Sequence, residues 1–240
     1  MTCPLGLLVL VHQRPQLIPL ICRQVAETWP GAAVHFTADR PSPEVWEAVD
    51  KVLHNVDLPL VVRAFDAPFP ALTHREQYIE LRQWQLERMQ QDNPMWCSMW
   101  DDDHILEDPR EAKKAMDGAP VDLLYIMKRY LWDRCDQQNL SLPAHNSIMF
   151  FRNLPCQRWT RMVHAPHPIH DTGRPGQLQG GLLDIGYLRP PERARVWEVY
   201  KRAGKIDPLT LGMIDSMPHI APFKSDSPWF QALKEIYPDE

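Results

Sequence analysis

The residue types most able to do chemistry lie in the stretch MWCSMWDDDHILEDP, residues 95–109. Three consecutive aspartates, Asp101, Asp102 and Asp103, follow a run rich in Met and Trp. In an extended backbone the side chains at i and i+2 point the same way, so Asp101 and Asp103 would share one face. Two such carboxylates suit Mg²⁺ or Mn²⁺, which take oxygen ligands and leave positions for phosphate oxygens. The alternative is a solvated acidic turn before a helix.

The elements around the aspartates favour the metal-binding interpretation. Apolar runs predict strands at residues 5–12, 32–39, 60–67 and 94–100. Helical stripes and caps, including Ser42-Pro43 and a T-x-x-E box at Thr73 and Glu76, predict the helices between them. This alternation predicts an α/β fold with an open, mostly parallel sheet flanked by helices. Ligands of such sheets bind beyond the carboxyl ends of the strands, and the aspartates follow the fourth strand.

Beyond Gly118 the alternation loosens. Runs at 121–132 and 145–154 predict strands with a polar loop between them. Residues 164–181, rich in Pro, Gly and His, predict a long loop over the site. Residues 190–204 predict a helix, and the proline-rich residues after it are expected to be irregular.

Composition limits the function classes. The chain has 240 residues, 44% of them hydrophobic, and a net charge of −5, which gives no global sign of nucleic-acid binding. The 5 cysteines are scattered without a C-x-x-C pair, which favours a reducing compartment over a disulfide framework. The N-terminal apolar run is short and lacks a preceding basic region, so we expect a soluble cytoplasmic protein.

At these residues the chain resembles GT-A-fold glycosyltransferases. The resemblance rests on FTAD at 36–39 and on MWDDDH at 99–104 after a long arginine-bearing helix. It extends weakly through GGLLDIGYLRPPERARVWEVY at 180–200, similar to an H-x-G-Y … P-E-x-R … Y stretch of small family members. It implies one GT-A-like (Rossmann-like) domain over 1–240, with a nucleotide-sugar-binding half at 1–118 and an acceptor-side half at 119–240.

The resemblance also implies roles for individual residues. The nucleotide-sugar-binding group comprises Val11, His12, Arg14, Asp39, Arg75 (with Arg82 as the alternative arginine), Asp101 and Asp102. Asp103 would bind the divalent metal, Mn²⁺ or Mg²⁺, that bridges the diphosphate. Relatives often carry His in the H-x-G-Y segment as a further ligand, whereas this chain has Asp184, so either Asp184 or His170 would complete the metal site. Asp171 is the candidate general base, with Asp184 as a second catalytic carboxylate.

Several residues are candidates for the acceptor side. Trp100 and Trp132 could form platforms for a sugar, with burial in the core as the alternative. Gly180 and Gly181 could let the backbone approach a donor sugar, with a flexible loop as the alternative. A basic rim including Arg189 and Arg193 could guide a phosphate-bearing acceptor, with a solvated helix face as the alternative.

The sequence therefore predicts a metal-dependent enzyme that moves a sugar from a nucleotide-diphosphate sugar, a UDP-sugar by preference, to an acceptor hydroxyl. The leading acceptor is a hydroxymethylated pyrimidine in DNA, which would have to be flipped out of a duplex. A soluble glycan or protein is the other acceptor class. A sugar-nucleotide nucleotidyltransferase is a second enzyme hypothesis, although VHQRPQ lacks the expected glycines. A nucleotide-sugar-binding module with a degenerate site is the non-enzyme hypothesis. The donor sugar, the stereochemical outcome and the oligomeric state stay open.

Overall fold

The structure is a computed structural model that describes residues 3–11, 14–38, 41–55, 57–68, 75–118, 120–142, 146–154, 174–191, 193–194, 197–198 and 217–238, without the side chains of 75–78 and 146–148. The chain forms two compact units. Unit 1 comprises Met1–Asp102, Pro109–Ile126 and Ser147–Gln179, and unit 2 comprises Asp103–Asp108, Met127–Asn146 and Gly180–Glu240. The units are interleaved along the chain, so no single cut, near residue 118 or elsewhere, separates them.

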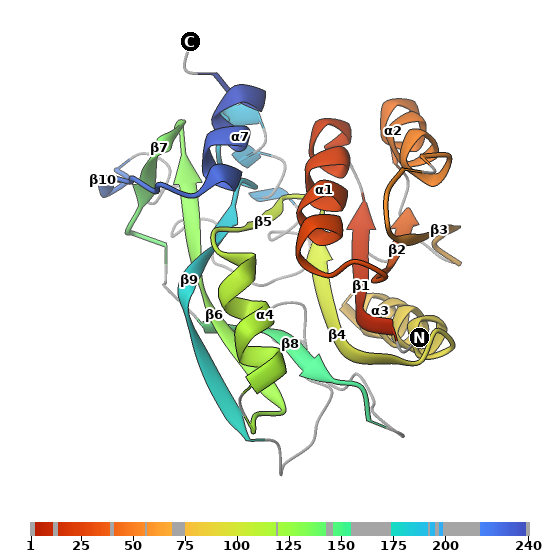
Figure 1. Cartoon of the computed structure of the whole chain (residues 1–240). Coiled ribbons are helices and arrows are strands. Elements are labelled where there is room, and N and C mark those ends of the chain that lie inside the picture. The colour runs from red at the N-terminus through yellow and green to blue at the C-terminus, as the bar shows by residue number, and fades with distance from the viewer. Residues whose placement is uncertain are drawn as a thin grey trace. The chain divides into compact units, whose positions relative to one another are not determined.

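Unit 1 is built on a parallel sheet. Its parallel strands lie side by side in the order β4 (Pro94–Asp101), β1 (Cys3–Val11), β2 (Ala33–Ala38) and β3 (Val61–Asp66) (Figure 1). β8 (Asn146–Arg152) pairs antiparallel with β4. The predicted α/β class with an open, mostly parallel sheet is confirmed in this unit, because each apolar run of the first hundred residues forms a strand.

Helices connect these strands and bury both faces of the sheet. They are η1 (Pro15–Leu17), α1 (Ile18–Thr28), α2 (Pro43–Leu53), α3 (Arg75–Gln90) and α4 (Pro109–Gly118). Leu8 of β1 belongs to a buried cluster with Leu86 and Met89 of α3. Leu7 and Val9 point to the opposite face by strand alternation and are fully buried as well. The continuous apolar sequence of β1 follows from this two-sided burial. The capping box predicted at Thr73 lies outside the described residues.

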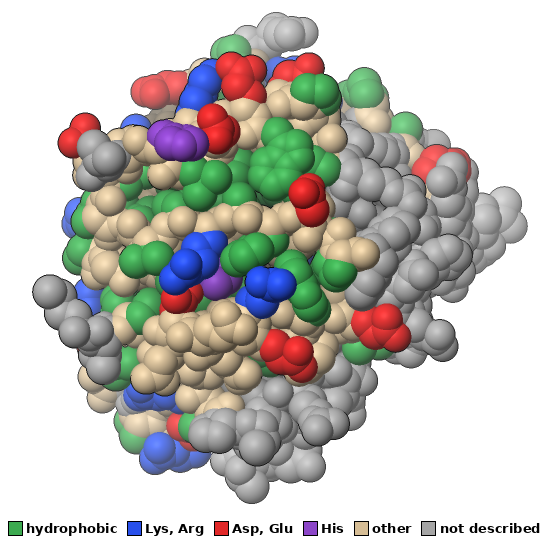
Figure 2. Space-filling model, turned by 90° about the vertical axis from the view of Figure 1, so that its right-hand side faces the viewer, with side chains coloured by type: hydrophobic (Ala, Val, Ile, Leu, Met, Phe, Trp, Pro, Cys, Tyr) green, Lys and Arg blue, Asp and Glu red, His purple; other side chains and the backbone are tan. Residues whose placement is uncertain are grey.

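β3 forms the exposed end of this sheet. Its first residue, Val61, is 46% exposed, and Leu53 at the end of α2 is also exposed. Figure 2 shows hydrophobic side chains on this side of the molecule, among acidic, basic and His side chains. No helix within the described ranges is both long and apolar enough to cross a bilayer.

Unit 2 is antiparallel. Two long strands, β6 (Leu123–Trp132) and β9 (Pro175–Asp184), contribute residues to both units. In unit 2, β7 (Arg134–Asn139) pairs antiparallel with β6 and with β10 (Ile220–Pro222), and β5 (His104–Leu106) pairs antiparallel with β9. The last helix is α7 (Pro228–Ile236), where Ser227 Oγ accepts a hydrogen bond of 3.2 Å from the N–H of Trp229.

Three expectations for this half of the chain were wrong. β7 occupies the predicted polar loop, Pro175–Gly181 belongs to β9 rather than to a loop, and β10 and α7 lie in the region expected to be irregular. The sequences RCDQQN and PGQLQGG lack apolar alternation, so their composition does not predict strands. They are strands because they hydrogen-bond to partner strands. Of the helix predicted at 190–204, the described residues 190–191, 193–194 and 197–198 are helical.

Candidate functional site

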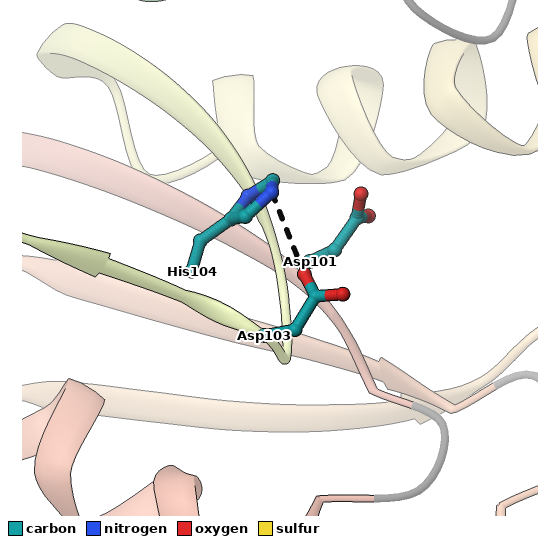
Figure 3. Close-up of side chains that lie close together, drawn as sticks. All are labelled: Asp101, Asp103 and His104. Atoms are coloured by element: carbon teal, nitrogen blue, oxygen red, sulfur yellow. Dashed lines mark ion pairs between the residues drawn. The ribbon is translucent and has the colours of Figure 1, made fainter. Parts of the chain in front are cut away.

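The aspartate stretch forms a tight connection between two strands. β4 ends at Asp101, residues 102–103 form a turn, and β5 begins at His104. The chain is therefore not extended through the D-x-D, as the sequence argument assumed. Even so, one ligand atom each of Asp101, Asp103 and His104 lie within 4.8 Å of one another, as Figure 3 illustrates. The turn brings the two aspartates together, and it adds a histidine that the sequence analysis did not assign.

Asp102, between the two aspartates, faces the chain that follows β1. Its N–H donates to the carbonyl of Leu10 at 3.0 Å, and its Oδ2 accepts from the N–H of Arg14 at 3.2 Å. The side chain of Asp102 is buried. Its carboxylate therefore holds the segment that the sequence analysis assigned to the nucleotide.

An arginine from α3 contacts the first aspartate. Arg82 Nη2 donates to Asp101 Oδ1, and Arg82 Nη1 donates to Gln85 Oε1 at 3.1 Å. The Arg82 side chain is 3% exposed and that of Asp101 is 40% exposed. The arginine is therefore buried, whereas the carboxylate it holds is accessible to solvent. Arg82, one of the two predicted arginines, lies beside Asp101. Arg75 begins α3, and its side chain lies outside the description.

In unit 2, β5 and β9 pair so that His104 lies opposite Asp184. His104 Nε2 is 3.4 Å from Asp103 Oδ1 and 3.8 Å from Asp184 Oδ2. Lys128 of β6 places its Nζ 2.9 Å from His104 Nε2 and 3.3 Å from Asp184 Oδ2. Because an ammonium group only donates, this contact with Lys128 uses the lone pair of His104 Nε2.

The surroundings of Asp184 keep its carboxylate ionised. Burial would raise the pKa of Asp184, but the Lys128 ammonium and the N–H of Gly186 hold that pKa well below its usual range. Gly186 leaves room for the two carboxylates in their present orientation. A Cβ there would lie 2.8 Å from Asp103 Oδ2 and 3.0 Å from Asp184 Oδ1.

Sequence reasoning missed two residues of this group, His104 and Lys128. His104 directly follows the D-x-D, and its position there was the available signal. Lys128 interrupts the apolar strand LLYIMKRYLW, where a charged side chain must find a partner. The partners of Lys128 are His104 of β5 and Asp184 of β9. Nothing in the sequence indicates that these strands lie beside β6.

Most of the predicted acceptor-side residues have structural contacts instead. Trp100 is fully buried and donates from Nε1 to Ser98 Oγ at 2.7 Å. Trp132 is buried against Tyr187, and the Arg193 guanidinium lies 4.3 Å from its ring centroid. Arg193 also donates to Asp133 Oδ1 at 2.8 Å. Neither tryptophan therefore presents a ring face on which a sugar could stack.

The paired glycines lie in β9. A Cβ at Gly181 would lie 2.5 Å from Arg129 Nε, so the glycine gives room for the ion pair between Arg129 and Glu107. Arg189 is exposed, with its guanidinium 5.3 Å from the Tyr237 ring centroid. Four predicted site residues lie outside the described residues: His12, Asp39, His170 and Asp171. Val11, the last residue of β1, is buried.

No protein-family model matches the chain, and no curated protein matches its sequence. Solved structures do resemble it. Residues 1–349 of S. aureus TarS in complex with UDP match 53% of this chain at 15% identity, with a TM-score of 0.42 and 36% of that chain covered. The mannosyltransferase PcManGT from Pyrobaculum calidifontis, in complex with GDP-Man and Mn²⁺, matches 54% at 14% identity, with a TM-score of 0.39 and 36% of that chain covered.

A further S. aureus TarS structure matches 100% of this chain at 11% identity, with a TM-score of 0.48 and 43% of that chain covered. The chain thus spans less than half the length of each of these structures.

Proposed function

We propose that this protein is a metal-dependent glycosyltransferase that moves a sugar from a nucleotide-diphosphate sugar to an acceptor hydroxyl. The observation that carries the proposal is the convergence of Asp101, Asp103 and His104 at the carboxyl end of β4, within 4.8 Å. Ligands of open α/β sheets bind at this end of the strands. The D-x-D motif and the order of elements resemble the GT-A glycosyltransferases in the same region.

The donor set fits a divalent cation. Two carboxylates suit Mg²⁺ and Mn²⁺, and the imidazole of His104 favours Mn²⁺ because Mg²⁺ prefers oxygen ligands alone. A bound ion would neutralise the charge that develops on a nucleotide-diphosphate leaving group. Asp103 and His104 are the proposed ligands, with Asp101 facing both the ion and the donor.

Other residues near Asp101, Asp103 and His104 would orient the nucleotide sugar. Arg82 fixes the Asp101 carboxylate from α3, and Asp102 secures the chain at Arg14, where the nucleotide is proposed to lie. Val11, His12, Asp39 and Arg75 complete the proposed nucleotide side. Asp184 is a poor candidate for a general base, because a carboxylate with a strongly lowered pKa accepts a proton weakly near neutral pH. The proposed base is therefore Asp171.

The acceptor is the finer part of the proposal. A hydroxymethylated pyrimidine in DNA is one candidate, and a soluble glycan or protein is the other. Arg193 is buried and paired with Asp133, so it is not available to bind a phosphate. Among the described residues of the proposed basic rim, Arg189 is exposed. Because Arg193 is not available for a DNA phosphate, we favour the glycan or protein acceptor over the DNA base.

Calorimetric titration with a panel of nucleotide sugars, with and without Mn²⁺, tests the proposal. We expect one UDP-sugar to bind the wild type in a metal-dependent manner and not to bind Asp103→Ala. The matched control is Asp117→Ala, which removes an exposed carboxylate of α4 that pairs with Lys113. Absence of binding by the wild type to every nucleotide sugar, with metal present, would contradict the proposal.

A further inference from the structure

We propose, on the basis of the metal site proposed above, that Lys128 competes with the metal for His104. Its ammonium group contacts the ring nitrogen of His104 that faces Asp103. Asp184 is the counter-ion that keeps Lys128 in place and receives it when a metal displaces it. In this proposal Asp184 is a positioning residue rather than a metal ligand.

The first argument is the contact itself. Lys128 Nζ lies 2.9 Å from His104 Nε2, the nitrogen that is also 3.4 Å from Asp103 Oδ1. One nitrogen lone pair cannot accept a hydrogen bond from an ammonium group and coordinate a metal at the same time. A metal that uses this nitrogen must therefore displace Lys128.

The second argument concerns charge. Asp103 Oδ1 lies 3.4 Å and Asp184 Oδ2 lies 3.8 Å from His104 Nε2. All three atoms carry lone pairs. Such acceptors repel one another unless a cation lies among them. Lys128, whose side chain is only 13% exposed, supplies that cation in the metal-free protein. The same charge opposes a divalent ion in its place.

The third argument explains why displacement is feasible. Asp184 is 7% exposed, and its two oxygens are held separately, Oδ1 by the N–H of Gly186 at 3.0 Å and Oδ2 by Lys128 at 3.3 Å. A lysine that leaves the histidine keeps this carboxylate as its partner. No buried charge is then left unpaired, which would be the costly outcome.

Calorimetric titration with Mn²⁺ alone, without nucleotide, tests the competition. The variant is Lys128→Met, and the matched control is Lys113→Met, which removes an exposed lysine that pairs with Asp117. We expect Lys128→Met to bind Mn²⁺ at least about tenfold more tightly than the wild type, equivalent to about 1.4 kcal/mol. The control should stay within about twofold of the wild type.

Lys128→Met also removes the counter-ion of the buried Asp184, so Lys128→Met/Asp184→Asn is measured beside it and folding is checked by circular dichroism. Tighter Mn²⁺ binding in either folded variant, including binding where the wild type shows none, supports the competition. A wild type that binds Mn²⁺ with the same affinity as both folded variants overturns it and leaves the proposed function standing. Failure of the wild type and every variant to bind Mn²⁺ also overturns the competition, and the nucleotide-sugar titration described above then tests the metal-dependent function separately.

Discussion

The backbone N–H of Arg14 donates to Asp102 Oδ2 at 3.2 Å, across a sequence separation of 88 residues. This hydrogen bond joins the chain that leaves β1 to the turn that follows β4. The N–H of Asp102 donates to Leu10 and continues the parallel pairing of the two strands past Asp101. The middle aspartate of the D-x-D therefore supports the positions of both flanking segments.

We expect Asp102→Ala to lower the free energy of unfolding by about 1–3 kcal/mol, because it leaves the N–H of Arg14 without its acceptor. Asp102→Asn keeps an acceptor oxygen and should lose less. Urea denaturation followed by circular dichroism measures both. Asp117→Ala, at an exposed position of α4, is the control and should change little. Equal stability of Asp102→Ala and the wild type would show that the hydrogen bond does not stabilise the fold.

Arg82 connects α3 to Asp101, so Arg82→Met should weaken binding of the nucleotide sugar by about tenfold or more, since charge-assisted hydrogen bonds contribute about 1.5–3 kcal/mol. Arg82→Lys keeps the charge but cannot donate to Asp101 and Gln85 in the same geometry, so it should rescue binding only in part. Calorimetry with the nucleotide sugar that binds the wild type in the titration described above measures the series. Arg23→Met, at an exposed position of α1, is the control. Wild-type affinity in Arg82→Met would remove this arginine from the proposed site.

Gly186→Ala places a methyl group 2.8 Å from Asp103 Oδ2 and 3.0 Å from Asp184 Oδ1. These are side-chain ends, so we expect the carboxylates to turn away and Mn²⁺ affinity to fall at least about tenfold while stability falls by about 1–3 kcal/mol. Gly118→Ala is the matched control, because nothing lies within 4 Å of the added Cβ. If Mn²⁺ binds Gly186→Ala as it binds the wild type, Asp103 does not need its present orientation for metal binding.

Acid should destabilise the fold through His35. Its Nε2 lies 2.6 Å from Asp92 Oδ2, and its buried Nδ1 has no hydrogen-bond partner within the described part of the chain. Burial lowers the pKa of His35 from its ordinary value of 6.5, although the hydrogen bond to Asp92 opposes this. The unfolded chain then binds a proton at a pH where the folded protein does not. This contribution to stability is present above pH 6.5 and is lost as the pH falls from 6.5 toward the pKa of the folded protein.

The free energy of unfolding should therefore fall between about pH 7.5 and about pH 5.5, and His35→Gln should reduce this dependence. Urea denaturation at several pH values measures it. His54→Gln is the control, because the His54 side chain is 76% exposed. The same pH dependence in His35→Gln and the wild type would assign the acid sensitivity to other groups.

The first half of the fold follows from its sequence because buried parallel strands need continuous apolar residues. β1 and β4 meet that need, which allowed both the sheet and the position of Asp101 to be predicted. β7 and β9 were missed because their polar and glycine-rich sequences are stabilised by partner strands. β-Propensity alone does not identify such strands.

The candidate site was predicted only in part for a related reason. His104 and Asp184 meet through the register of β5 against β9, and Lys128 reaches both from β6. Register between distant strands depends on tertiary pairing, which a single sequence does not display. The buried state of Trp100 could not be predicted either, since a tryptophan beside a charged turn suits a core or a ligand platform equally well.

The interleaving of the two units limits how the protein can be divided for expression. A fragment ending at residue 118 would contain β4 without β8, the antiparallel partner that comes from residues 146–152. The unpaired N–H and C=O groups of β4 would then form an open edge in the hydrophobic part of the sheet, a template for aggregation. A fragment that holds the strands of unit 1 therefore needs residues 146–152 as well, so that β8 can pair with β4.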